Sequence, residues 1–349
     1  MKRNSAIFFL LILPLLVFSA GCKSRQSEEK ITGGLSIGVF IPGVMAGSPI
    51  YEMLADGTRK AVEEFSSSNP GTSLTVIEGG FNQAEWESQL TTMAASLSYD
   101  LIVSSNPSLP VLVSSVSAKF PGQKFLILDG ELSGNPNVYT LRYNQREQAY
   151  MAGYIAALAS LELSAEGFPQ SGAKLLGLVA AQEYPVMNNV ILPGFLEGAR
   201  AVDPAFTVDF RLVGNWFDAA KAAEIAAGMI RSGANVLLPI AGGAGHGALQ
   251  AAAEAGAKVV WFDANGYALR PGTVIGSAVL RQDKAAYEKI TLYLNGNLPF
   301  GKAETAGAAG GFVDFIDDDP LYIAAVSGTI RDKQAQLIAR LRSGELKLD

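Results

Sequence analysis

Two short stretches of the chain have the spacing of motifs that carry out chemistry. Residues 34–38, Gly-Leu-Ser-Ile-Gly, fit the Gly-x-Ser-x-Gly pattern of a nucleophile elbow, which needs a strand before the serine and a helix after it. The apolar run after Ser36 predicts instead that this serine begins a strand, and the chain's only histidine, His246, would have to be its base. Residues 296–302 have Gly-x-x-x-x-Gly-Lys spacing, but Ala303 replaces the hydroxyl residue that binds magnesium in a phosphate loop. We interpret the first stretch as structural and the second as a chance match.

A third stretch, the glycine-rich segment 242–247, lies between a predicted strand and a predicted helix. In that context backbone amides can face a ligand. The glycines are out of register with the Gly-x-Gly-x-x-Gly fingerprint of dinucleotide binding. We therefore expect Gly242 and Gly243 to let the backbone approach hydroxyl groups, and we interpret His246 as a residue that starts the helix.

Other catalytic apparatus is not evident in the sequence. No cluster of His, Cys, Asp and Glu has the spacing of a metal site, and no pair of carboxylates stands out for acid and base work. We expect a protein that is not an enzyme and that needs no cofactor.

The amino terminus has the pattern of an export signal. Lys2 and Arg3 precede an apolar run over residues 7–18, and the small residues 19–21 lead directly to Cys22. Because Cys22 is the only cysteine, it cannot form an internal disulfide. The pattern predicts a signal peptide over residues 1–21 and acyl chains on Cys22, which would anchor the protein on the outer face of the cell membrane. The alternative is an ordinary signal peptide with an incidental cysteine.

Length and charge limit the class of protein. Residues 22–34 are polar and lack periodicity, which is typical of a flexible tether. The rest of the chain is longer than one core usually organises, so we expect two domains. Without Lys2 and Arg3, 25 basic and 33 acidic residues give a net charge of −8, which argues against a nucleic-acid partner.

Apolar β-rich runs alternate with helical patterns in two series, which predicts an α/β fold with two doubly wound lobes. The expected strands are residues 35–41, 73–77, 101–103 and 125–128 in the first series, and 175–179, 207–212, 236–239 and 259–262 in the second. Helices are expected over residues 50–65, after Ser48 and Pro49, and from Asp218 to Gly233. We expect lobe 1 to comprise residues 35–141 and roughly 268–349, and lobe 2 residues 142–267, with a third crossing at an unplaced point after Leu298.

Several segments in this order resemble the basic membrane protein family, the PnrA-like purine-nucleoside-binding lipoproteins of ABC transporters. The segments are residues 125–130, 148–154, 184–186, 194–199, 214–221, 241–245 and 262–263. The resemblance runs from about Leu35 to the C-terminus. It implies a type I periplasmic-binding-protein-like fold, in which a hinge joins the lobes and the ligand lies between them. It also implies a small-molecule ligand and an ABC permease as partners.

The resemblance also implies roles for individual residues. Trp216 matches an aromatic residue that stacks on the base, and Asp263 matches an aspartate that accepts hydrogen bonds from ribose. The loop at residues 43–48 lacks the family's second stacking aromatic, where Met45 is a candidate to cover the ring. Leu280 stands at the position of a family lysine. Asn106 and Glu183 are candidates because each follows a predicted strand.

These features together predict capture and delivery of a nucleoside or a related ring-containing, hydroxylated molecule, without chemical change. Binding of a sugar or another small metabolite on the same fold is the alternative. A second alternative is a sensory lipoprotein that delivers its ligand to a receptor instead of a permease. An enzyme would have to act on a nucleoside without a metal or an evident acid–base pair.

Overall fold

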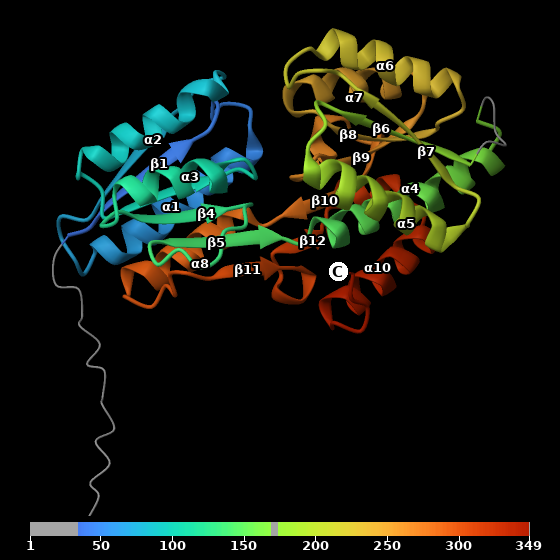
Figure 1. Cartoon of the computed structure of the whole chain (residues 1–349). Coiled ribbons are helices and arrows are strands. Elements are labelled where there is room, and N and C mark those ends of the chain that lie inside the picture. The colour runs from blue at the N-terminus through green and yellow to red at the C-terminus, as the bar shows by residue number, and fades with distance from the viewer. Residues whose placement is uncertain (1–33, 169–173, 349) are drawn as a thin grey trace, which may run out of the picture.

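The structure is a computed structural model that describes residues 34–168 and 174–348. The described chain forms two lobes, each a six-stranded sheet covered by helices on both faces (Figure 1). The predicted signal peptide, Cys22 and nearly all of the predicted tether lie in residues 1–33, outside the described residues. Among the residues described, no helix has the length and apolar character needed to cross a membrane.

The sheet of lobe 1 is parallel throughout, with strand order β11-β5-β4-β3-β1-β2. Its strands are β1 (Ser36–Ile41), β2 (Ser73–Glu78), β3 (Leu101–Ser105), β4 (Lys124–Leu128), β5 (Val138–Tyr143) and β11 (Ala303–Ala306). The helices are α1 (Pro49–Ser66), α2 (Trp86–Ala95), α3 (Leu109–Lys119) and α8 (Gln282–Leu294). Because side chains alternate along a strand, Val39 belongs to the core under α1 and α8 and Phe40 to the core under α2 and α3.

The sheet of lobe 2 has strand order β12-β10-β9-β8-β6-β7, and only β12 is antiparallel to its neighbour. Its strands are β6 (Leu175–Ala180), β7 (Thr207–Leu212), β8 (Val236–Ile240), β9 (Lys258–Asp263), β10 (Val274–Leu280) and β12 (Val313–Phe315). Its helices are α4 (Gln145–Ala165), α5 (Leu192–Val202), α6 (Ala219–Arg231), α7 (Gly245–Ala255), α9 (Pro320–Ala325) and α10 (Gly328–Arg342). The helices α4 and α5 pack closely because Gly153 and Gly198 have no side chain to separate them.

The predicted α/β fold with two doubly wound lobes is confirmed, and each of the eight predicted strands is present within one or two residues. The expected cap of α6 is also confirmed, because the Asp218 carboxylate accepts a hydrogen bond of 3.0 Å from the Lys221 amide. At α1 the expectation holds only in part. Pro49 is the first helical residue, but the Ser48 side chain makes no capping hydrogen bond.

The carboxyl-terminal part of the chain is divided between the lobes, which differs from the expected assignment of residues 268–349 to lobe 1. Only α8 and β11 join lobe 1, where α8 packs on α1 and β11 pairs with β5. The strand β10 pairs with β9, β12 pairs with β10, and α10 packs on α4, so these elements belong to lobe 2. The third crossing, unplaced in the sequence, lies between β11 and β12.

Hydrogen bonds tie the three crossings into one hinge. The crossings follow β5, β10 and β11, and each is short. The Asn144 amide donates to the Ala306 carbonyl over 2.8 Å, and the Arg281 amide donates to the Phe312 carbonyl over 2.8 Å. The Glu147 carboxylate accepts a hydrogen bond of 2.7 Å from the Ala308 amide. Three bonded crossings allow the lobes to move about a defined axis.

Candidate functional site

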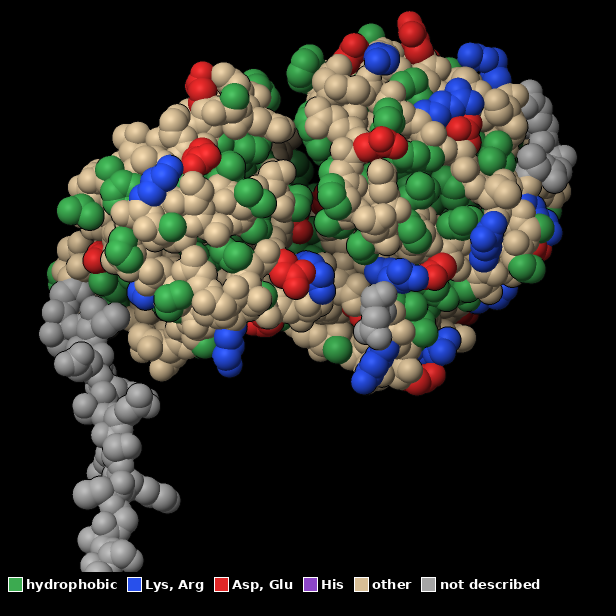
Figure 2. All heavy atoms as spheres, viewed as in Figure 1, with side chains coloured by type: hydrophobic (Ala, Val, Ile, Leu, Met, Phe, Trp, Pro, Cys, Tyr) green, Lys and Arg blue, Asp and Glu red, His purple; other side chains and the backbone are tan. Residues whose placement is uncertain are grey.

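The loops that follow the parallel strands of the two lobes face each other across the hinge. In an open α/β sheet, such loops at the carboxyl ends of the strands are where ligands bind. Figure 2 shows the surface hollowed between the two lobes. The residues placed at these strand ends are Met45, Tyr51, Asn106 and Asp129 in lobe 1, and Glu183, Tyr184, Trp216, Gly242, Gly243 and Asp263 in lobe 2. We call this region the cleft.

Two half-buried aspartates, one from each lobe, are the most unusual feature of the cleft. Asp129 follows β4 and Asp263 is the last residue of β9, and both have left-handed backbones with φ of 52° and 71°. A residue other than glycine is rarely held in this conformation, and where it is, the surrounding structure must stabilise it. The backbone at each aspartate is therefore held in this conformation by its surroundings.

Burial and like charge perturb both carboxyl groups. Burial, with the negative charge of Asp263 as a second cause, raises the pKa of Asp129 from 3.8 to about 7. Burial also raises the pKa of Asp263 to about 6, although a hydrogen bond from Gln148 opposes this change. Both carboxylates therefore gain from any group that brings hydrogen-bond donors into the cleft.

Gln148 holds Asp263 in place from the hinge. This residue lies in the first turn of α4, and its side-chain nitrogen donates to Asp263 Oδ1 and to the carbonyl of Ala278, each over 3.0 Å. Its side-chain oxygen is buried and has no hydrogen-bond partner among the described residues. One amide thus joins a cleft carboxylate to β10, the strand that leads into the second crossing.

Trp216 lies beside Tyr184 and the glycine loop. The two rings are tilted by 39° with centroids 6.4 Å apart, and the indole side chain is 37% exposed. A Cβ atom at Gly242 would lie 3.2 Å from the Trp216 carbonyl oxygen and 3.4 Å from its Cε3 atom. Gly242 has a φ of +54°, and the Ala244 amide donates to the Trp216 carbonyl over 3.1 Å. The glycines therefore pack against Trp216, a reason for their presence that the sequence pattern did not indicate.

Tyr184 and Tyr51 bring hydroxyl groups to the same region. Burial raises the pKa of Tyr184 well above its usual value of 10, and the charges of Asp263 and Asp129 add to this effect. The Tyr51 hydroxyl donates to the Pro42 carbonyl over 3.0 Å. Burial also raises the pKa of Tyr51, to about 12. Both tyrosines are therefore neutral donors at physiological pH.

The remaining predicted residues differ in their surroundings. The Asn106 amide donates to the Tyr51 hydroxyl over 3.3 Å and accepts from the Ser108 amide over 2.9 Å, so it is fixed at the end of β3. The Met45 amide donates to the Glu78 carboxylate over 3.1 Å, and its side chain packs against the core. Glu183 is exposed. Roles of these three residues in binding remain predictions.

Sequence reasoning did not single out Asp129, Tyr184, Tyr51 or Gln148. A signal was present, because Asp129, Tyr184 and Gln148 all lie in segments that carry the family resemblance. What the sequence could not supply is that the ends of β4 and β9 face the same cleft from opposite lobes. Ser36 begins β1 and so lies at the opposite end of that strand from the cleft, and the centroid of the His246 ring lies 5.5 Å from that of Trp261.

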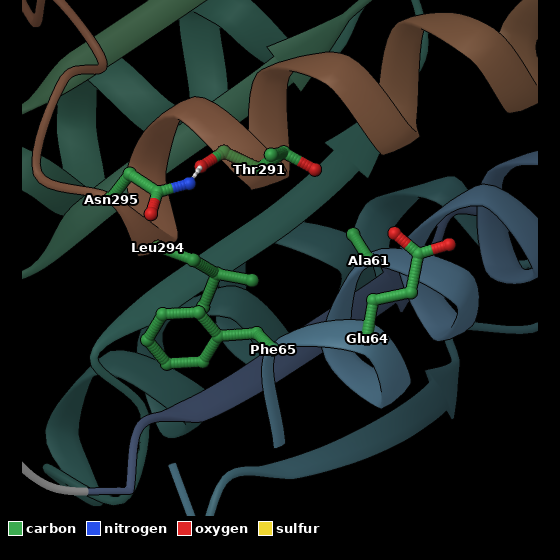
Figure 3. A pocket seen from close by; sticks show the side chains of 6 residues that line it. All are labelled: Ala61, Glu64, Phe65, Thr291, Leu294 and Asn295. Carbon is green, nitrogen blue, oxygen red and sulfur yellow. Dashed lines mark hydrogen bonds between the residues drawn. The ribbon is translucent and has the colours of Figure 1, made fainter. Parts of the chain in front are cut away.

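A separate small hollow of ≈ 190 Å³ lies between the last turns of α1 and α8 (Figure 3). Its lining residues are Ala61, Glu64, Phe65, Thr291, Leu294 and Asn295. Because α1 begins at the carboxyl end of β1 and runs back toward the start of β2, its last turn lies at the opposite end of lobe 1 from Asp129. This hollow is therefore not part of the cleft.

A family model described as ABC transporter substrate-binding protein PnrA-like matches residues 35–347. The ABC transporter nucleoside-binding protein BmpA of Lactococcus lactis is 28% identical over 250 residues, which cover 71% of this chain and 67% of that protein. Basic membrane protein A1 of Borrelia garinii is 24% identical over 337 residues, which cover 94% of this chain and 93% of that protein.

The fold has close counterparts among solved structures. A solute-binding protein of an ABC transporter system from Aeropyrum pernix superimposes with a TM-score of 0.78 at 22% identity. The superposition covers 90% of this chain and 93% of that one. The two-lobed architecture is thus that of solute-binding proteins.

Proposed function

The chain belongs to the PnrA-like family of ABC transporter substrate-binding proteins, and we propose that it captures a nucleoside between its two lobes for import through an ABC permease. A purine nucleoside, or a similar ring-containing, hydroxylated molecule, has the groups that the cleft residues bind. The protein releases this ligand unchanged.

The pair of aspartates in the cleft is the observation that carries this proposal. Asp129 and Asp263 come from different lobes, and each carboxylate lacks an ion-pair partner among the described residues. A vicinal diol or an N–H edge supplies donors to such acceptors. A neutral ligand that donates to both carboxylates binds the closed form better than the open form, which makes closure dependent on the ligand.

The ring contact supports an aromatic ligand. Trp216 is 37% exposed at the cleft, with its indole supported by Tyr184 and by the Gly242 backbone. A rigid, half-exposed indole is suited to stack on a flat base. The positive-φ backbone of Gly242 lets the loop approach the indole closely, so the ring is held at a fixed position.

A sugar is the second candidate ligand. One aromatic side chain beside two carboxylate acceptors also suits a pyranose, since a sugar needs one apolar surface and several acceptors for its hydroxyls. The one pair of aromatic rings in contact among the described cleft residues, Trp216 and Tyr184, comes from lobe 2. A sensory role, in which the liganded protein contacts a receptor instead of a permease, would use the same cleft.

The amino terminus supports a location on the outer face of the membrane. Cys22 follows an apolar run and three small residues, as in lipoproteins that are exported and then acylated. We propose that acyl chains on Cys22 hold the protein next to its permease.

Calorimetric titration tests the ligand. The protein is unfolded and refolded to remove any bound ligand, and is then titrated with adenosine, guanosine, inosine and cytidine. The proposal predicts heat with the purine nucleosides and little with cytidine. Heat with glucose or ribose and none with any nucleoside would favour the sugar alternative. No heat with any of these from a folded sample would reject both ligand classes.

A further inference from the structure

Two exposed phenylalanines lie on opposite lobes at the cleft. Phe81 of lobe 1 is 74% exposed and Phe217 of lobe 2 is 70% exposed, and neither packs against a hydrophobic core. Each ring follows the strand of its sheet that lies farthest from the three crossings, on the open side of the cleft.

Matching turns present the two rings. The strands β2 and β7 each lie at one edge of their sheet, next to β1 and β6 respectively. The Gly79 amide donates to the Ile41 carbonyl over 2.7 Å, and the Val213 amide donates to the Ala180 carbonyl over 2.9 Å at the corresponding place. The two turns therefore leave their strands in the same way.

A left-handed glycine follows at the same position in each turn. Gly80 has a φ of +66° and Gly214 a φ of +94°, and each amide donates to the loop after the neighbouring strand. An asparagine then fixes the chain, because Asn82 Oδ1 accepts from the Ala84 amide and Asn215 Oδ1 accepts from the Phe217 amide over 3.0 Å. Aromatic side chains are thus held at equivalent edges of both lobes by rigid backbone.

Local packing does not account for either ring. Trp216, next to Phe217, turns to Tyr184, but Phe217 has no ring contact among the described residues. In lobe 1, the neighbouring Trp86 is buried and donates to the Gly80 carbonyl over 3.1 Å, whereas Phe81 is directed to solvent. Both rings are therefore free to contact a surface outside their own lobe.

From these matching turns, we infer that Phe81 and Phe217 meet when the lobes close and form an apolar clasp over the cleft. The clasp slows the escape of the ligand. This role rests on the proposed function, whereas the contact between the two rings does not. Closure of the hinge brings equivalent edges of the two sheets together, which requires no rearrangement within either lobe.

Cross-linking tests the contact. In the full-length protein in detergent, with Cys22 replaced by serine, Phe81→Cys and Phe217→Cys are combined and treated with a short bismaleimide. The matched control combines Leu97→Cys with Phe217→Cys. Leu97 is 82% exposed but lies between α2 and β3, at the opposite end of lobe 1. Because the reagent reacts irreversibly, brief closures accumulate as product even when the closed state is rare.

The inference predicts a cross-link for the Phe81 and Phe217 pair at a yield several times that of the control, with a further increase in the presence of adenosine. A cross-link that forms but does not respond to any nucleoside would support the clasp and count against the nucleoside proposal alone. A yield equal to that of the control would overturn the clasp, even if adenosine binds.

Discussion

The Asp263 carboxylate has one side-chain donor among the described residues, the Gln148 amide at 3.0 Å. Its other lone pairs are therefore open to a ligand. If a nucleoside or sugar hydroxyl donates to it, Asp263→Ala removes a hydrogen bond to a charged group, which is worth about 1.5–3 kcal/mol. We expect the dissociation constant to rise tenfold or more while the protein stays folded, as measured by calorimetric titration and thermal unfolding.

The control for this substitution is Asp332→Ala, which removes an exposed carboxylate of α10. It should leave both the affinity and the melting temperature unchanged. Full affinity in Asp263→Ala would show that the ligand contacts are assigned to the wrong residue.

Asp129 gives the ligand-free protein a pH-dependent stability. Its pKa in the folded state, about 7, lies above its ordinary value of 3.8. The folded state therefore binds a proton at Asp129 more tightly than the unfolded state does. This proton stabilises the folded state fully below pH 3.8, and the stabilisation is lost as the pH rises to about 7. We expect the free energy of unfolding of Asp129→Asn to decline less than that of the wild type between pH 4 and pH 7.

Denaturant titrations at several pH values measure this difference. Asp332→Asn serves as the control and should follow the wild type. Parallel curves for the wild type and Asp129→Asn would contradict the raised pKa.

The sequence singled out seven residues that lie at the cleft and missed Asp129, whose charge affects Asp263 from the opposite lobe. The seven are Met45, Asn106, Glu183, Trp216, Gly242, Gly243 and Asp263. Trp216 and Asp263 were predicted from the resemblance, and the structure places both at the cleft. Asp129 lies in the segment 125–130, which carries the same resemblance, but its effect on Asp263 depends on the position of the opposite lobe. The sequence pattern predicts where each strand ends. The position of Asp129 relative to Asp263 depends instead on how the three crossings orient the two lobes.

Packing between α4 and α5 depends on two glycines. A Cβ atom at Gly153 would overlap the Phe195 carbonyl oxygen, and one at Gly198 would overlap the Tyr150 carbonyl oxygen. Backbone atoms cannot move aside as a flexible side chain can. Gly153→Ala should therefore lower the free energy of unfolding by about 1–3 kcal/mol, the usual cost of overpacking, as measured by denaturant titration.

Gly228→Ala in α6 is the matched control. The nearest atom to its Cβ would be the end of the Arg211 side chain, 2.9 Å away, which can move. Alanine is the better helix former, so this variant should be more stable by roughly 0.5–1 kcal/mol. Equal destabilisation in both variants would contradict the claim that contact with backbone atoms is the reason that Gly153→Ala is destabilising.

Eight of the twelve strands in the described part of the chain were predicted. Val138–Tyr143, Val274–Leu280, Ala303–Ala306 and Val313–Phe315 were not. Thr207–Leu212 was predicted with its observed bounds. The short strands Ala303–Ala306 and Val313–Phe315 were missed because each is an edge strand that forms only against a distant partner. This same long-range pairing divides the C-terminal part of the chain between the lobes, which local patterns do not encode.

At the scale of the whole molecule, the proposed anchor makes a simple prediction. Replacing Cys22 removes the only thiol that could be acylated. Cys22→Ser should move the protein from the membrane fraction to the soluble fraction, as measured by fractionation and immunoblotting. The control is the conservative change Ser24→Ala, which should stay with the membrane. Retention of Cys22→Ser at the membrane would contradict lipid anchoring.

The central claim is that the ligand is held between the lobes, and small-angle X-ray scattering tests this claim most directly. A nucleoside that binds by calorimetry should lower the radius of gyration of the wild-type protein, because closure of the hinge brings the lobes together. The decrease should be absent in a variant that combines Asp129→Asn with Asp263→Ala, at the same nucleoside concentration. Binding that leaves the radius of gyration unchanged, or a decrease that persists in the double variant, would contradict the account.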